Sequence, residues 1–231
     1  MLLNIAHENE WKINFLKFLY RERILEIIIL HIIDIIGTMA FALAGYIISS
    51  RADYDILGIT FISFISAFAG GVTRDVMLGH IPGIFLASYS MIAVVIVIII
   101  AMSLKYHSTH SSESLEQNKL FVIADTIGLS TFAYTGATLG IQSALNPGGI
   151  IFLALFSAVG GGLFRDVIMN KHAYVLKEDF YGAVAVIVGL LVILMNAFGF
   201  LNPLTGIGII GIGIAVRLIA IKYQWHLPKM K

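Results

Sequence analysis

The stretch Gly70-Gly71-Val72-Thr73-Arg74-Asp75-Val76 places flexible backbone and two opposite charges within an otherwise apolar run. The pattern recurs as Gly161-Gly162-Leu163-Phe164-Arg165-Asp166-Val167, at an offset of 91 residues (165 − 74). Paired glycines and paired charges at one fixed spacing indicate an internal duplication. The same offset relates further pairs in the runs before the two motifs: Asp34 and Asp125, Gly37 and Gly128, Phe41 and Phe132, Gly45 and Gly136, Gly58 and Gly149, Ser66 and Ser157.

The composition is that of a membrane protein. Of 231 residues, 58% are hydrophobic and 13% are charged, and the mean hydropathy is +0.91. A soluble domain does not bury this much apolar surface. The net charge of +1 and the lack of basic clusters with aromatic platforms argue against nucleic acid as a partner. The absence of cysteine excludes disulfides, thiolate metal sites and cysteine nucleophiles.

Seven apolar runs are long enough, at about 1.5 Å per residue, to cross roughly 30 Å of hydrocarbon, which predicts an all-α integral membrane protein. Helix N-caps are predicted at Asp55 and at the Asn-Pro pairs that begin at Asn146 and Asn202. The predicted spans are Ile24–Ile48, Ile56–Leu78, Ile84–Leu104, Leu120–Ile141, Gly148–Met169, Phe180–Phe200 and Leu204–Ile221.

The spans divide into two copies of three, followed by a seventh span outside the duplication. Because three is odd, the second copy enters the membrane from the opposite side, so the repeats are predicted to be inverted. The predicted organisation is an interfacial amphipathic segment (1–23, with Trp11, Phe15 and Leu19), a first repeat (24–105), a polar linker rich in Ser and His (106–118), a second repeat (119–200), and the seventh span with its tail (201–231).

The distribution of Lys and Arg predicts the orientation. One side of the membrane carries Arg51, Lys105, Lys119, Lys171, Lys177, Lys222, Lys229 and Lys231, and the other carries Lys12, Lys17, Arg21 and Arg23. The excess favours a cytoplasmic C-terminus and an external N-terminus in a plasma membrane.

The charges of the two motifs are expensive in a membrane, since Arg or Asp at a helix centre costs roughly 2.5–3.5 kcal/mol on insertion scales. Neighbouring residues point to different sides of a helix, so we do not expect Arg74 to neutralise Asp75 directly. Asp34 and Asp125 are the expected cross-helix partners of the arginines. Either these pairs only lock helices together, or they line a water-filled path and act on a permeating species.

The glycines beside the arginines also have two interpretations. Gly70-Gly71 and Gly160-Gly161-Gly162 lower helix propensity and favour a kink or an unwound turn beside a midplane cavity. Alternatively, they allow close packing of helices through small residues.

Other signals are weak. A G-x-G-x-x-G match at residues 206–211 lies in an apolar span without a preceding strand, and His107 and His110 lack a carboxylate cluster for a metal. No set of nucleophile, base and orienting acid suggests a hydrolase. We therefore expect no cofactor, no bound metal and no enzymatic activity.

Two G-G-x-x-R-D motifs in inverted three-span repeats, with a seventh span, resemble the prokaryotic trimeric intracellular cation channels, the TRIC family. The resemblance extends from about Ile24 to Ile221. It implies a homotrimer in which each subunit encloses a pore for monovalent cations, potassium foremost, lined by kinked second and fifth helices. The pore residues that it implies are Gly70, Gly71, Arg74, Asp75, Gly161, Gly162, Arg165 and Asp166, to which the pairing argument adds Asp34 and Asp125.

The four carboxylates of this set outnumber its two arginines, which is compatible with cation selectivity if they face the path. Animal members carry a different charged motif after their glycines, with a lysine implicated in phosphoinositide binding. This chain has Arg-Asp there, so the resemblance does not extend to lipid regulation, and membrane lipid is an expected partner. Related bacterial sequences carry a glycine-transporter label. The rival hypothesis is therefore a secondary transporter of a small zwitterion or amino acid such as glycine, since carriers also use inverted repeats with broken helices.

Overall fold

The structure is a computed structural model that describes residues 2–104, 118–170 and 180–225, with side chains from residue 27 onward and that of Leu25. Within these ranges the chain forms helices and no strands. The helices are α1 (Leu2–Ser50), α2 (Ile56–Met77), α3 (Gly83–Leu86), α4 (Tyr89–Ser103), α5 (Lys119–Gln142), α6 (Pro147–Ile168), α8 (Tyr181–Ala197) and α9 (Pro203–Lys222).

Five helices have apolar stretches long enough to cross a membrane, namely Ile27–Ser50 within α1 and the whole of α2, α5, α6 and α9. The apolar helices α4 and α8 are shorter, at 15 and 17 residues. This is the architecture of a multi-pass integral membrane protein. The third predicted span is wrong in its first turn, because Gly83–Leu86 forms a separate short helix and Ala87 is extended before α4 begins.

The predicted N-caps are confirmed. Asp55 accepts a hydrogen bond from Gly58 N at 2.7 Å, and Asn146 accepts one from Gly149 N at 2.8 Å. Asn202 forms a full capping box at the start of α9. Each cap satisfies backbone donors that a helix leaves free at its first turn, so the polar residues between apolar runs set where α2, α6 and α9 begin.

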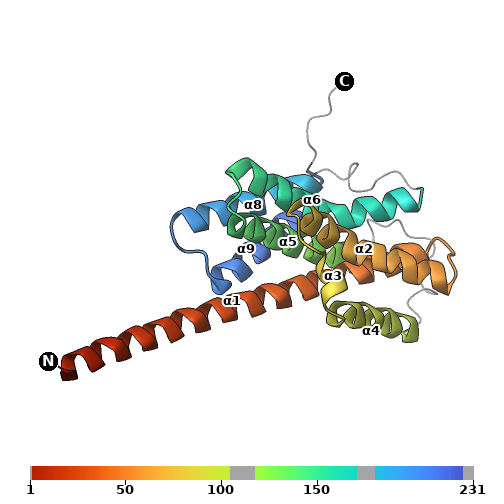
Figure 1. The fold of residues 1–231 in the computed structure, drawn as a ribbon. Helices are drawn as coiled ribbons and strands as arrows, with labels where there is room; N and C mark the ends of the chain where they lie inside the picture. Colours follow the sequence, from red (N-terminus) through yellow and green to blue (C-terminus); the bar gives the residue numbers. More distant parts are fainter. Residues whose placement is uncertain (1, 105–117, 171–179, 226–231) are drawn as a thin grey trace.

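The chain shows no break at the predicted boundary after residue 23, because α1 is one continuous helix. Figure 1 shows its N-terminal half projecting away from the other helices. An interfacial location for residues 1–23 stays a prediction. The predicted linker lies outside the described residues except for Asn118, whose side chain caps α5 by accepting from Phe121 N at 2.9 Å.

The first helices of the two repeats, α1 and α5, cross in opposite directions. A Cβ on Gly37 would meet the Phe132 ring at 2.9 Å, and a Cβ on Gly128 would meet the Phe41 ring at 2.6 Å. The two rings lie 5.5 Å apart. Each aromatic ring therefore packs against a glycine of the other repeat. The contact of Gly37 with Phe132 is repeated by the contact between their equivalents, Gly128 and Phe41.

The second helices, α2 and α6, cross in the same exchanged manner. A Cβ on Gly70 would collide with the carbonyl oxygen of Ser157, and one on Gly161 would collide with that of Ser66. Both helices remain α-helical through their glycines, so the predicted unwound turn is wrong. A kink without unwinding stays a prediction. Close backbone approach is the role that these contacts support directly.

The helix outside the duplication, α9, packs on the second repeat, against α5 and α8. A Cβ on Gly213 would lie 2.8 Å from Val188 and 3.0 Å from Ser130 Oγ, so this contact also requires a small residue. The core on this side includes Val184, Val188 and Ile209. The two repeats therefore have different surroundings, because α9 covers one of them.

Candidate functional site

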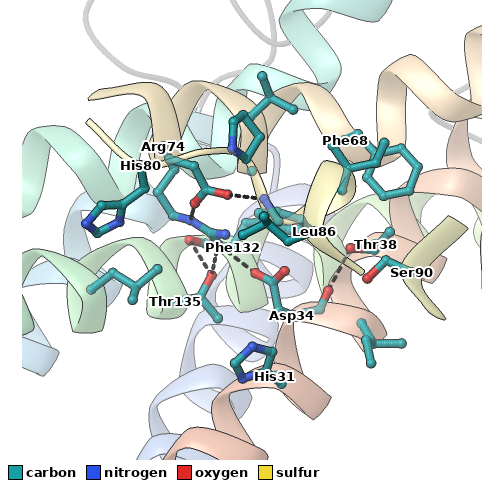
Figure 2. Close-up of a pocket in the computed structure, with 18 of the residues that line it drawn as sticks. His31, Asp34, Thr38, Phe68, Arg74, His80, Leu86, Ser90, Phe132 and Thr135 are labelled. Atoms are coloured by element: carbon teal, nitrogen blue, oxygen red, sulfur yellow. Dashed lines mark hydrogen bonds and ion pairs between the residues drawn. The ribbon is translucent and has the colours of Figure 1, made fainter. Parts of the chain in front are cut away.

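A cavity of about 580 Å³ lies among α1, α2, α3, α4 and α5. Figure 2 shows polar side chains from three of these helices converging in it, with Asp34, Arg74 and Thr135 close together and His31 and His80 farther out. Both histidines are exposed. The first copy of the motif therefore borders an accessible cavity. Water in this cavity can solvate the charges, which would otherwise be costly within a membrane.

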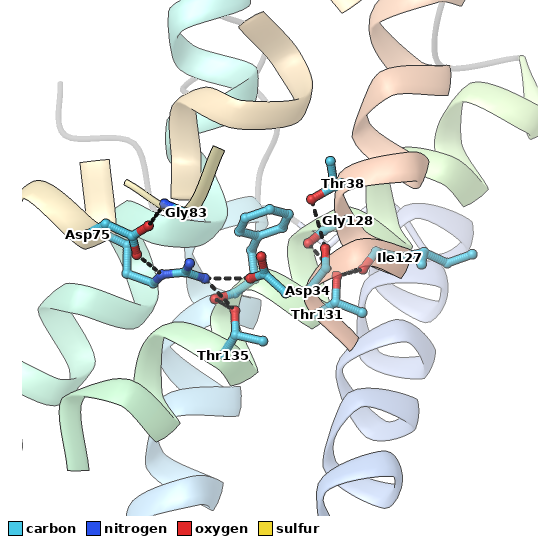
Figure 3. Close-up of polar contacts among 10 residues, drawn as sticks. Asp34, Thr38, Asp75, Gly83, Ile127, Gly128, Thr131 and Thr135 are labelled. Atoms are coloured by element: carbon cyan, nitrogen blue, oxygen red, sulfur yellow. Dashed lines mark hydrogen bonds and ion pairs between the residues drawn. The ribbon is translucent and has the colours of Figure 1, made fainter. Parts of the chain in front are cut away.

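Arg74 is held by three hydrogen bonds, drawn in Figure 3. Its Nη1 donates to Asp34 Oδ1 at 2.6 Å and to Thr135 Oγ1 at 3.1 Å, and its Nε donates to Asp75 Oδ1 at 2.9 Å. The predicted cross-helix pairing with Asp34 is confirmed. The expectation that Arg74 does not pair with Asp75 is wrong, because the long side chain folds back and brings its Nε to the next carboxylate.

Asp75 also fixes the chain that follows α2. Its second oxygen, Oδ2, accepts from Gly83 N at 3.0 Å, which attaches the start of α3 to the end of α2. Arg74 and Asp75 lie in the last turn of α2. A cation in the last turn is favoured by the helix dipole, which offsets part of the cost of Arg74 there.

The ring of Phe132 closes another side of the Arg74 guanidinium, with 5.9 Å from Cζ to the ring centroid. A Cβ on Gly71 would lie 3.3 Å from the same ring. Gly71 therefore leaves room for an aromatic surface beside the charge. A cation over an aromatic face gains a modest attraction, which is larger where water is excluded.

The electrostatic character of the cavity follows from its lining. Two carboxylates, Asp34 and Asp75, face one guanidinium, Arg74, so the lining has one excess negative charge when His31 and His80 are neutral. The side chain of Asp34 is 31% exposed and that of Arg74 only 7%. The negative partner is therefore the one more accessible from the cavity.

The second copy of the motif has the same pairing but different surroundings. Arg165 Nε donates to Asp166 Oδ1 at 2.8 Å, and its Nη1 lies 3.5 Å from Asp125 Oδ1. The predicted Arg165–Asp125 ion pair is confirmed. All three side chains are at most 4% exposed. Phe121 lies over the guanidinium at 5.5 Å, as Phe132 does over Arg74. The low exposure of its carboxylates shows that this charge cluster is enclosed, whereas Asp34 in the first copy is 31% exposed.

Residues outside the duplicated motifs also differ between the two sites. Ser90 lines the cavity, whereas its equivalent 91 residues later, Tyr181, is fully buried. Arg217 of α9 lies over the Tyr181 ring, 4.9 Å from its centroid, and is itself 2% exposed. Arg217 was not predicted from the sequence, although an arginine inside the apolar run of the seventh span has the same free-energy cost in a membrane as Arg74.

Four of the ten predicted pore residues line the cavity: Asp34, Gly71, Arg74 and Asp75. Two, Gly70 and Gly161, lie at the crossing of α2 and α6. The other four, Gly162, Arg165, Asp166 and Asp125, are buried in the second half. Other polar and aromatic side chains of the two sites were not predicted from the sequence, among them His31, His80, Phe132, Thr135, Tyr181 and Arg217. Among the described residues, no three His, Cys, Asp or Glu side chains gather as a metal site would require.

Comparison with known proteins matches both halves of the chain to one family. A family model described as glycine transporter matches residues 31–106 and again residues 122–197, at the same offset of 91 residues (122 − 31). The UPF0126 membrane protein YvgT of Bacillus subtilis is 30% identical over 201 residues, which cover 85% of this chain and 94% of that protein.

Solved structures share the fold over nearly the whole chain. A prokaryotic TRIC channel crystallised in 0.5 M KCl superposes with a TM-score of 0.77 at 27% identity, covering 87% of this chain and 99% of the other. A structure described in terms of conductance through TRIC cation channels gives a TM-score of 0.75 at 26% identity, covering 87% and 97%. The chain therefore belongs to the family that the glycine transporter model describes, and it is a member of the prokaryotic TRIC family.

Proposed function

We propose that this protein is a channel for monovalent cations, potassium foremost, with one path in each subunit. The observation that carries the proposal is the cavity that ends on Asp34, Arg74 and Asp75, with one carboxylate in excess of the guanidinium. An excess of negative charge around a narrow polar passage lowers the energy of a cation that loses part of its water. No chemical reaction is part of the proposal.

The path continues from the cavity along the crossing of α2 and α6. Gly70 and Gly161 allow the two backbones to meet there, and Gly71 and Gly162 follow them on the same helices. Beyond the crossing it reaches Arg165, Asp166 and Asp125, which repeat the charges of the first half. This route assigns all ten residues to the wall of one pathway, with its first half open and its second half closed.

The architecture that we propose is seven spans, six of them in two inverted repeats. The exchanged contacts support it: Gly37 meets Phe132 while Gly128 meets Phe41, which is the relation that a two-fold axis produces. The double match of the family model at one offset supports it as well. The short helices α4 and α8 are the third spans of their repeats in this architecture.

The assembly that we propose is a homotrimer in the plasma membrane, with the C-terminus in the cytoplasm. The TRIC channels that share the fold support the trimer. Exposed apolar side chains along α4, among them Ile92, Ile96 and Ile99, suit contact with lipid or with another subunit. In this orientation the open cavity, at the end of α2, faces the outside, because Arg51 and Lys222 mark the opposite side.

A secondary transporter of a small zwitterion such as glycine is the second candidate. The description of the family model favours it. So does the presence of both charge signs in the cavity, because Arg74 suits a carboxylate while Asp34 and Asp75 suit an ammonium group. The cavity volume of about 580 Å³ also favours a carrier, because it is within the range of small-molecule sites.

The decisive experiment is recording from purified protein in planar bilayers, with potassium chloride at two concentrations across the membrane. Discrete current steps that reverse near the potassium equilibrium potential support the channel. Uptake of labelled glycine by proteoliposomes, saturable and without current steps, would replace the channel by the carrier. Asp34→Asn is the matched variant, because it should lower potassium conductance in the first case and glycine uptake in the second.

A further inference from the structure

The two repeats differ in side-chain size at one pair of equivalent positions beside the charged residues. Ser90, near the start of α4, lines the open cavity. Tyr181, its equivalent at the start of α8, is 0% exposed and is packed beside the second charge cluster. A small hydroxyl therefore stands in the open half where a large phenol stands in the closed half. The difference in volume at this single position fits the difference in access.

Arg217 holds the phenol in place. Its guanidinium lies 4.9 Å from the centre of the Tyr181 ring, and it is close enough to Asp125 to interact with it electrostatically. Cation–π attraction is strongest where both partners are withdrawn from water, as they are here. Because α9 lies outside the duplication, the first repeat contains no equivalent of this arginine.

A second contact fixes the same end of α8. Phe180, the residue before Tyr181, has a left-handed backbone with φ 72°, and its ring meets Trp225 in a T-shaped contact at 5.4 Å. An aromatic residue rarely adopts this conformation, which persists only where the surroundings hold it. Arg217 of α9 and Trp225, three residues after α9 ends, thus hold the start of α8 at two adjacent residues.

The enclosed cluster also has polar atoms that suit a hydrated chamber. Asp125 Oδ1 and Arg165 Nη1 are buried 3.5 Å apart with no hydrogen bond between them, and Arg165 Nη2 is buried without a hydrogen-bond partner among the described residues. Such groups are costly when dry and are satisfied by water when a site opens. The second charge cluster therefore has polar groups that water could satisfy, although its side chains are packed too closely to be exposed to solvent.

We propose that Tyr181, held by Arg217, is a plug that keeps water and cations out of the half of the path around Arg165. Movement of the start of α8 away from α9 withdraws the phenol and opens a chamber equivalent to the cavity around Arg74. Passage of ions through that chamber rests on the proposed function. The exclusion of water by Tyr181 does not, and it is tested separately.

The natural absence of cysteine makes thiol labelling a clean measurement. Ile35 lines the open cavity, and Thr126, its equivalent 91 residues later, is 1% exposed beside Asp125. Single variants Ile35→Cys and Thr126→Cys are purified in detergent, where both faces are accessible, and reacted with a cationic methanethiosulfonate. We expect Thr126→Cys to react at least about tenfold more slowly, because a buried thiol is protected from the reagent.

The plug is then removed in the Thr126→Cys background. Tyr181→Ser, which copies Ser90, should raise the labelling rate about tenfold or more, whereas Tyr181→Phe, which keeps the ring, should leave it low. Arg217→Gln provides a second route, since it frees the ring without removing it and should also accelerate labelling. Size-exclusion chromatography and circular dichroism verify that each variant retains the parent's assembly and helicity.

Three results would overturn the plug. The first is equal labelling rates for Thr126→Cys and Ile35→Cys when Tyr181 and Arg217 are both present. The second is slow labelling of Thr126→Cys in both the Tyr181→Ser and the Arg217→Gln background. The third is loss of assembly in both of these double variants. Bilayer recordings distinguish failure of the plug from failure of the proposed channel function. Faster labelling with a higher open probability supports both, whereas faster labelling without current in parent or variant supports the plug and refutes the channel.

Discussion

Removing each arginine of the duplicated motif should produce two different phenotypes, although the local sequences are nearly the same. Arg165→Ala removes the guanidinium that pairs with Asp125 and Asp166, whose side chains are 4% and 1% exposed. Breaking a buried ion pair typically costs about 3–5 kcal/mol, because the remaining charge stays unsolvated. In a domain of this size that corresponds to a fall in melting temperature of the order of 10 °C.

Arg74→Ala should be milder. The carboxylate that it leaves on α1, Asp34, is 31% exposed toward the cavity and can be solvated there. The expected cost is roughly 1–3 kcal/mol, between the values for surface and for buried ion pairs. The charge of the cavity lining changes from one excess negative charge to two, so potassium conductance should change and block by magnesium should become stronger.

The assay is the melting temperature of both variants by circular dichroism in one detergent, followed by bilayer recordings over a range of potassium and magnesium concentrations. Arg74→Lys and Arg165→Lys are the matched controls, since each keeps the positive charge. Equal losses of stability in the two alanine variants would refute the inference that burial distinguishes the two halves. Parental currents in a well-assembled Arg74→Ala variant would refute a position of Arg74 on the path.

Three further substitutions test the packing and the polar contacts. Gly70→Ala should lower the melting temperature, because its Cβ collides with the carbonyl oxygen of Ser157. Gly71→Ala should lower it less, because its Cβ meets only side-chain atoms, of Phe132 at 3.3 Å and Arg74 at 3.8 Å; equal losses would argue against the close crossing. Thr135→Val should cost about 1 kcal/mol through the lost hydrogen bond to the cavity guanidinium, and Thr135→Ser should restore it. Asn202→Ala should cost about 1 kcal/mol by uncapping α9, seen as earlier thermal unfolding with unchanged helicity below the transition.

The features that the sequence predicted well are those that depend on local pattern and on spacing. The caps at Asp55 and Asn146 follow from side chains that bond to the backbone of their own turn, so no distant residue is needed to place them. The pairing of Arg74 with Asp34 was predicted from the free-energy cost of a charge in an apolar span, which an opposite charge offsets. The offset of 91 residues identified the corresponding pair in the second repeat.

The predictions that failed depend on side-chain conformation and on backbone packing. Pattern alone treats Arg74 and Asp75 as pointing apart, but a long side chain with a donor at Nε reaches back to its neighbour. Pattern also favours unwinding at Gly70-Gly71, whereas an opposing helix stabilises the α-helix by packing its backbone against the glycine. Propensity describes an isolated helix, and tertiary contacts override it.

By itself, the sequence determined that the chain lies in a membrane, that it is duplicated, and that each copy carries a paired arginine. Only the tertiary structure decided that one copy borders a cavity and the other is sealed. The two motifs could not reveal this difference, because they are nearly identical. It depends on Tyr181, at an equivalent position of different size, and on Arg217, from a helix without an equivalent. Accessibility depends on everything packed around a residue, and these neighbours become adjacent only when the chain has folded.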